Sequence, residues 1–313
     1  MFFWSLIKRM LMFRIIGLLL CLMLLHDAQS QRRLAYHEFE AENISKIHLY
    51  GSFCDVKISH DPKIRFLGEI EGSGRPDDFT ISSDLSTSGT LVIHVRHRGR
   101  KSNYISKARI QLHIPKGILL NIDNTTGDIK GDNLISGTYH FKSSSGDVSL
   151  SEVIGDLRVE TTSGDISIEN LQGEAQFRST SGDKYIGNVQ GTVRASGTSG
   201  STYLHNIIGP VHLSSTSGNV TLREIKGRVE VTSTSGNIYT RQLLITGDSK
   251  FALISGNLKI DLSNPHDDFK FQLMTGSGTI SVNGNAFKRQ YLEGDGPIVI
   301  DAATGSGNLD LHF

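Results

Sequence analysis

Apolar residues recur in fixed columns through the middle of this chain. Counted from the glycine of a repeated Thr-Ser-Gly-Asp phrase, they fall two, four, seven, eleven and thirteen residues later. Steps of 18 to 20 residues separate successive copies of that glycine, at Gly127, Gly146, Gly164, Gly182, Gly200, Gly218, Gly236 and Gly256. Self-similarity at a fixed period of this length is typical of repeat architectures.

The columns predict two short strands in every repeat. Ile166 and Ile168 are two residues apart and therefore lie on one face of a strand, and Ala175 and Phe177 do the same for a second strand. A second glycine, such as Gly173, follows nine residues after the first, so each repeat has two glycine corners. Stacking the repeats at about 4.8 Å buries all five columns. We predict an all-β fold, a single-stranded β-solenoid with about 18 residues per turn, right-handed by the crossover preference.

Two other solenoids fit the spacing less well. A left-handed hexapeptide helix also has 18 residues per turn, but it needs apolar residues every six positions, and the columns here are unevenly spaced. A calcium-binding nonapeptide roll needs Asp after both corners. Here Asp follows only one corner, and later repeats replace it with Ser201, Asn219, Asn237 and Asn257. We therefore expect no metal and no cofactor.

The first 30 residues have the pattern of a signal peptide. Basic residues precede an apolar run from Ile15 to Leu25, which is too short to span a bilayer, and small residues at Ala28 and Ser30 predict cleavage before Gln31. Met10 and Met12 are alternative starts to Met1. A lipoprotein anchored at Cys21 lacks the small residue that should precede the cysteine, and an uncleaved anchor is the other alternative. We expect an exported protein of the periplasm, cell surface or extracellular space, with no integral membrane segment after cleavage.

The mature chain divides into three parts. Residues 31–120 alternate apolar and polar positions without a helical pattern and are expected to form N-terminal strands and a cap. Residues 121–262 carry the regular repeats. Residues 263–313 are expected to form irregular turns and a second cap, with Leu309–Phe313 as the closing strand. A basic run at residues 96–101 is interpreted as a solvated hairpin tip, with an anionic glycan or lipid contact as the alternative.

Composition argues against a nucleic-acid partner and against a disulfide-stabilised fold. The 32 basic and 32 acidic residues give zero formal charge, so we expect no nucleic-acid partner. Cys54 is the one cysteine left after cleavage, which excludes an intrachain disulfide, and its apolar surroundings predict a buried structural thiol.

The Thr-Ser-Gly-Asp-Ile phrase resembles that of a known family. Together with Ile114-Pro-Lys-Gly117 ahead of it and Thr304-Gly-Ser-Gly307 at the end, it is similar to the bacterial putative-adhesin family of β-strand-repeat proteins. These are domain-of-unknown-function proteins related to the auto-transporter adhesin head domain. The resemblance covers roughly residues 36–313. It implies a secreted or envelope-associated β-solenoid and brings no catalytic residues.

Two ladders of polar residues are interpreted as structural. The acidic ladder of Asp128, Asp147, Asp165 and Asp183 is ordinary turn chemistry, because Asp and Asn cap their own backbone after glycine. The Ser and Thr columns before the glycine adjoin a corner, which argues against an ice-binding plane. No His or carboxylate accompanies them to activate a nucleophile.

One outward-facing stripe is the candidate binding site. Its residues lie three and five positions after the repeat glycine and are Tyr185, Tyr203, His205, Arg223, Tyr239 and Arg241. Such a stripe can stack on sugars or hold an acidic polymer, although tyrosines also pair well with one another on a strand surface.

The sequence thus predicts a non-catalytic binding or scaffold protein of the cell envelope, with a glycan or surface component as partner. The alternative is a carbohydrate-active β-helix enzyme of the polysaccharide lyase or hydrolase type, with Lys184 and Arg223 as candidate bases.

Overall fold

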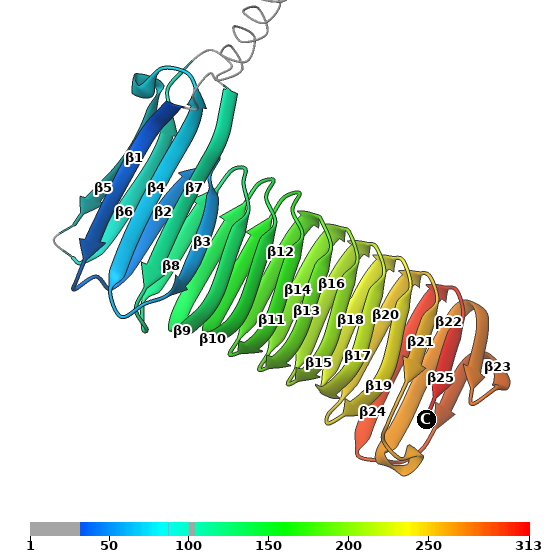
Figure 1. Ribbon diagram of the computed structural model, residues 1–313. Coiled ribbons are helices and arrows are strands. Elements are labelled where there is room, and N and C mark those ends of the chain that lie inside the picture. The colour runs from blue at the N-terminus through cyan, green and yellow to red at the C-terminus, as the bar shows by residue number, and fades with distance from the viewer. Residues whose placement is uncertain (1–31, 87, 100–103) are drawn as a thin grey trace, which may run out of the picture.

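The chain folds into one long stack of β-strands. The computed structural model describes residues 32–86, 88–99 and 104–313, and these contain 25 strands, two short 3-10 turns and no α-helix (Figure 1). The all-β prediction is confirmed. No helix in these ranges has the length and apolar character needed to cross a membrane, and the expected signal peptide lies outside them.

The repeats form the body of the stack. Two long strands near the start each continue across both sides of a coil, and after them strands from one side alternate along the chain with strands from the other side. In chain order they are β8 (Leu119–Asn124), β9 (Ile129–Ser143), β10 (Val148–Thr161), β11 (Ile166–Gln172), β12 (Ala175–Ser181), β13 (Lys184–Gln190), β14 (Val193–Ser199), β15 (Thr202–Ile208), β16 (Val211–Ser217), β17 (Val220–Gly227), β18 (Val229–Ser235), β19 (Ile238–Ile245), β20 (Ser249–Ser255) and β21 (Leu258–Asp261).

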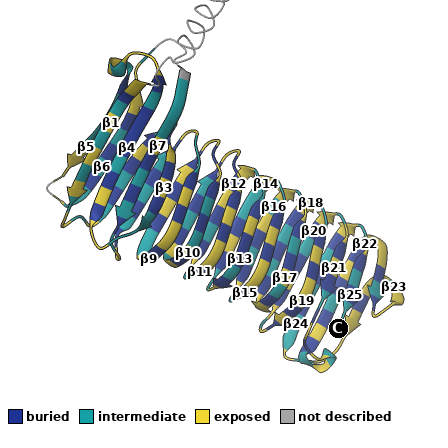
Figure 2. Cartoon of the chain, viewed as in Figure 1, coloured by how far each residue is buried: buried dark blue, intermediate teal, exposed yellow. Residues whose placement is uncertain are grey.

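Pairing between coils is parallel. Strand β11 pairs with β13 so that Ile166 lies beside Lys184, and β12 pairs with β14 so that Ala175 lies beside Val193. Both registers place each residue beside the one 18 positions later. Side chains of the predicted apolar columns are buried in one continuous core, and exposed residues alternate with them along the strands of the coils (Figure 2).

The glycine corners and the residues after them lock neighbouring coils together. A Cβ on Gly164 would lie 2.1 Å from the carbonyl oxygen of Gly146, so only glycine fits this approach. The amide of Asp165 donates to Oδ1 of Asp147 at 2.9 Å, and the amide of Asp183 donates to Oδ1 of Asp165 at 2.8 Å. The acidic ladder is therefore structural, but its carboxylates accept hydrogen bonds from the neighbouring coil and do not cap their own turn as predicted.

A third corner lies within the first strand of each coil. Asn188 has a φ of 52°, in the left-handed region, and shifts the alternation so that Val189 turns inward. Its Oδ1 accepts a hydrogen bond from Nδ2 of Asn206 at 2.7 Å. The same corner recurs at Asn133, Glu152, Asn170, Asn206, Glu224 and Gln242. The expectation of two corners per coil was incomplete, because Asn also tolerates this conformation.

The N-terminal strands extend both sides of the stack and then end it with antiparallel pairs. Strands β2 and β3 join the coils in parallel, β4 pairs antiparallel with β1 and β7, and β5 pairs antiparallel with β6. Their bounds are β1 (Arg32–Ala41), β2 (Lys46–Ser52), β3 (Asp55–His60), β4 (Ile64–Ser73), β5 (Phe79–Leu85), β6 (Thr90–His97) and β7 (Tyr104–Ile114), with a 3-10 turn η1 (Pro76–Asp78).

Two titratable groups are buried in this N-terminal region. Cys54 is buried as predicted, and burial raises the pKa of its thiol to about 12. Glu69 on β4 contacts Lys107 at 2.8 Å, Arg109 at 3.3 Å and Arg33 at 3.4 Å. The hydrogen bond from Lys107 is the main cause that lowers the pKa of Glu69. The basic run at residues 96–101 lies partly outside the described residues.

Coil order at the C-terminal end differs from the order of the sequence. The last strands are β22 (Phe269–Val282), β23 (Asn285–Glu293), β24 (Ile298–Ser306) and β25 (Leu309–His312), with a 3-10 turn η2 (His266–Asp268). Strands β24 and β25 lie between the β20–β21 coil and β22, and β23 folds back antiparallel on β22. The expectation that Leu309–Phe313 closes the stack was wrong, because β22 lies further out.

Candidate functional site

The stripe predicted from the sequence lies on the outer surface of β13, β15, β17 and β19. Tyr185 pairs in register with Tyr203, Tyr203 with Thr221, and Thr221 with Tyr239. The three tyrosines are 45%, 38% and 42% exposed in chain order. The stack therefore places the stripe residues on one surface, and Thr221 interrupts the tyrosine row.

Two of the tyrosines form a stacked pair. The ring centroids of Tyr185 and Tyr203 are 4.9 Å apart and their planes differ by 2°. This distance matches the spacing of neighbouring strands, so the stack is a direct result of the coil register. The hydroxyl of Tyr185 also donates a hydrogen bond to Oδ2 of Asp183 at 3.1 Å. Burial is the main cause that raises the pKa of Tyr185, and this hydrogen bond is the second. Tyr185 is thus held in place by its neighbours.

Thr221 leaves a gap between two aromatic rings. One face of Tyr203 is covered by Tyr185, while the strand on its other side carries the short Thr221 side chain. Tyr239 lies on the next strand, two strand spacings or about 9.6 Å from Tyr203. We name this space, bounded by Tyr203, Thr221 and Tyr239, the Thr221 gap.

The basic residues of the stripe differ in their partners. Arg223 Nε lies 3.0 Å from Oε1 of Glu224, and His205 Nδ1 lies 3.8 Å from its Oε2. Glu224 is one of the left-handed corner residues, so the corner directs these two side chains. Arg241 has no hydrogen-bond or ion-pair partner among the described residues. Of the three, Arg241 is the basic side chain that is free to contact a ligand.

Lys184, a candidate base of the enzymatic alternative, lies inside the core. Its side chain is 0% exposed, and burial lowers its pKa. Nζ lies 3.5 Å from the carbonyl oxygen of Gly182. Room for the ammonium comes from Gly197, where a Cβ would lie 2.8 Å from Nζ. Lys184 therefore faces away from any substrate on the outer surface.

Sequence reasoning missed a second set of polar residues on the opposite strands. Arg178 on β12, Arg194 on β14 and His212 on β16 point outward around the small side chains of Ser196 and Ser214. The signal lies at positions twelve and fourteen after the repeat glycine, where long and short polar side chains follow one another from coil to coil. Among residues 32–86, 88–99 and 104–313, no group of three or more His, Cys, Asp or Glu side chains is arranged to hold a metal ion.

Solved structures with similar folds cover most of the chain. A putative adhesin from Bacteroides fragilis is 12% identical, with a TM-score of 0.41, over 91% of this chain and 98% of that one. A putative adhesin from Parabacteroides distasonis is 8% identical, with a TM-score of 0.47, over 90% and 98%. A putative lipid binding protein from Parabacteroides distasonis is 12% identical, with a TM-score of 0.28, over 88% and 96%.

Family comparison covers nearly all of the described residues. No curated protein matches the chain. The model of the family described as Toastrack DUF4097 matches residues 44–208 and again residues 206–312. These two matches together span every described strand except β1, and they confirm the family resemblance seen in the sequence. The chain belongs to the Toastrack DUF4097 family.

Proposed function

We propose that this protein is an exported, non-catalytic binding protein of the cell envelope that holds a carbohydrate of a surface component on the stripe. The observation that carries the proposal is the Thr221 gap, where an uncovered face of Tyr203 meets an exposed surface. Adhesin is also the word attached to several of the similar solved structures, all at low identity.

The spacing of the strands at the gap suits a sugar ring. Apolar C–H faces of a pyranose pack on aromatic rings, and tyrosine rings supply such a surface while their hydroxyls stay in water. A separation of about 9.6 Å between the strands of Tyr203 and Tyr239 leaves room for one ring between them. Arg241 lies two residues beyond Tyr239 on β19 and offers hydrogen-bond donors at the edge of the gap.

Filling the gap and removing its wall are complementary tests. Thr221→Tyr should complete the tyrosine row and exclude the sugar, and Tyr203→Ala should remove the ring on which it stacks. We expect both variants to lose signal on a glycan array that the wild type labels. Tyr185→Ala/Tyr203→Ala should lose it as well. Tyr36→Ala, at an equally exposed tyrosine on β1, is the matched control and should bind normally.

Two outcomes would contradict the proposal, the first for the whole stripe and the second for the Thr221 gap. One is equal labelling by the wild type and the Tyr185→Ala/Tyr203→Ala variant. The other is stronger labelling by Thr221→Tyr, which would show that the ligand contacts the edges of the tyrosine row and does not enter the gap.

Export and coil geometry complete the proposal. The basic and apolar pattern of residues 1–30 supports secretion, and fractionation of native cells followed by N-terminal sequencing tests it, with Gln31 as the expected first residue. We also propose a right-handed coil of about 18 residues per turn. The 18-residue offsets between paired strands support the period, and the preference of parallel crossovers supports the hand.

A further inference from the structure

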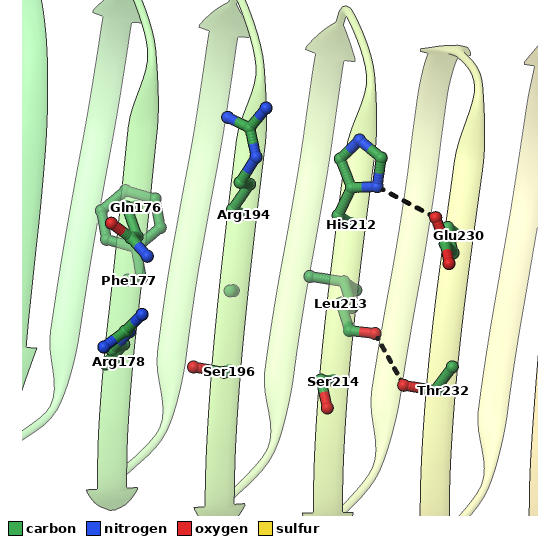
Figure 3. Close-up of a pocket in the computed structure, with 11 residues that line it drawn as sticks. Gln176, Phe177, Arg178, Arg194, Ser196, His212, Leu213, Ser214, Glu230 and Thr232 are labelled. Carbon is green, nitrogen blue, oxygen red and sulfur yellow. Dashed lines mark hydrogen bonds and ion pairs between the residues drawn. The ribbon is translucent and has the colours of Figure 1, made fainter.

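A hollow lies on the strands opposite the stripe. It spans β12, β14, β16 and β18, has a volume of about 330 Å³, and is lined by two parallel rows of side chains (Figure 3). One row runs Gln176, Arg194, His212, Glu230, and the other runs Arg178, Ser196, Ser214, Thr232. We name it the Arg178 hollow.

Differences in side-chain length create the hollow. In register, Arg178 lies beside Ser196 and Ser196 beside Ser214, so one long side chain is followed by two short ones on successive strands. Arg194 and His212 stand in the neighbouring row and form a wall above the serines (Figure 3). The two serine hydroxyls therefore form the floor of the hollow, and the longer basic side chains form its sides.

The donors around the hollow are largely unused. Arg178 has no hydrogen-bond or ion-pair partner among the described residues, and neither Ser196 nor Ser214 makes a side-chain hydrogen bond there. Arg194 Nη1 lies 3.5 Å from Oε2 of Glu174, and the arginine side chain remains 50% exposed. Glu230 is the carboxylate of the hollow, and it is engaged by His212 at 3.2 Å. The hollow therefore presents hydrogen-bond donors from Arg178, Ser196 and Ser214 that have no acceptor among the described residues.

Free donors of this kind select an anionic group. A guanidinium binds the oxygens of a carboxylate or a sulfate through paired N–H bonds, and nearby hydroxyls satisfy the remaining oxygens. A neighbouring hollow of about 370 Å³ shares Gln176 and Arg194 with it and also carries Asp156, Arg158 and Glu174. A ligand anchored by its anionic group therefore has room to extend along the axis of the stack.

We propose that the Arg178 hollow binds the carboxylate or sulfate of an acidic sugar within an oligosaccharide. Arg178 and Arg194 hold the anionic group, Ser196 and Ser214 donate to it from the floor, and the adjoining hollow accepts the next sugar. This site is on different strands from the stripe, so it stands whether or not the stripe binds a ligand.

Direct titration tests the hollow. Isothermal titration calorimetry is carried out with a sulfated tetrasaccharide, a tetra-galacturonate and an uncharged tetrasaccharide of similar length. We expect one or both acidic probes to bind, the uncharged probe to fail, and the affinity to fall as salt is raised. Arg178→Gln should weaken binding by about tenfold or more. Ser196→Glu, which places a carboxylate on the floor, should abolish it.

Control variants separate this site from the stripe. Lys259→Gln removes the same charge from an exposed position on β21 and should leave the affinity unchanged. Failure of both acidic probes to bind would overturn the proposal, as would equal affinity of Arg178→Gln and the wild type. Loss of acidic-sugar binding in Tyr203→Ala, with Arg178→Gln unaffected, would place the ligand on the stripe and also overturn it.

Discussion

Replacing Gly164 with alanine probes the contact on which coil stacking depends. A Cβ at this position would lie 2.1 Å from the carbonyl oxygen of Gly146 and 2.7 Å from its carbon. Ordinary carbon–oxygen contacts begin at about 3.3 Å, so the two coils must separate by about 1 Å at this corner. Backbone conformation adds no penalty, since Gly164 is not in the left-handed region.

The cost follows from the hydrogen bonds that the separation breaks. Three bonds of 2.9 Å cross between the coils at this corner: Val148 N to Asp165 O, Ser163 N to Ser144 O, and Asp165 N to Oδ1 of Asp147. Each contributes about 1 kcal/mol net. We therefore expect Gly164→Ala to lower the free energy of unfolding by about 3 kcal/mol.

Urea denaturation followed by circular dichroism measures the effect, and amide hydrogen exchange locates it. Protection should fall in β10 and β11 more than in β17 to β19, because a stacked repeat protein transmits strain mainly to its nearest neighbours. Gly247→Ala is the matched control. The added Cβ there would have its nearest atom at 4.0 Å, and this glycine also lies outside the left-handed region.

The reasoning is refuted if Gly164→Ala and Gly247→Ala have the same unfolding free energy. That result would mean that the corner relaxes without loss of its hydrogen bonds, and that the glycine column has another cause.

Two further predictions concern buried charges. Lys184→Met should raise the free energy of unfolding at neutral pH by about 1–2 kcal/mol, because it removes a buried ammonium that has one long hydrogen bond. Burial lowers the folded-state pKa of Lys184, so wild-type stability should rise with pH towards the unfolded pKa of about 10.4, and the variant should lose this rise in urea titrations across that range. Glu69 behaves in the opposite sense. Its folded pKa is lowered, so its contribution is complete above the unfolded pKa of about 4.3 and is lost as pH falls through the folded pKa. Glu69→Gln should make the urea midpoint depend less on pH between about pH 7 and pH 3, and an unchanged slope would contradict the assignment.

Much of the coil could be predicted because its core is periodic. Ile166, Ile168 and Phe177 identify inward columns by spacing alone. When similar coils stack, such columns can be buried only in the interior of the stack. The left-handed corner at Asn188 was missed because it carries no apolar residue. Its signal was the three-residue step between Ile186 and Val189, where a regular strand would have had two.

Coil order at the C-terminal end could not be derived from local pattern. Gly276-Ser-Gly278 and Gly305-Ser-Gly307 carry the same phrase, and the strands that follow them are equally apolar. Either could therefore stack on β21. Which one does depends on the loop and hairpin between them, whose packing a column of residues does not encode.

The candidate site was predictable in position and not in detail. The stripe follows from strand alternation. The ion pair between Arg223 and Glu224 depends on the left-handed corner at Glu224, which the apolar columns do not show. The Arg178 hollow depends on short side chains standing beside long ones on neighbouring strands. Such a contrast becomes visible only when coils are aligned against one another.

Placement of β24 and β25 inside the stack has a consequence for the order of assembly. From β9 to β21, a chain synthesised from its N-terminus can add each coil to the previous one as it emerges. Strand β22 emerges next, yet the position it finally takes is separated from β21 by the segment 298–312, which has not yet been made. Until that segment arrives, the growing stack ends in an unpaired edge, which is a template for association with other chains. Completion of this fold is therefore a single late event, in which two coils become paired at the same time.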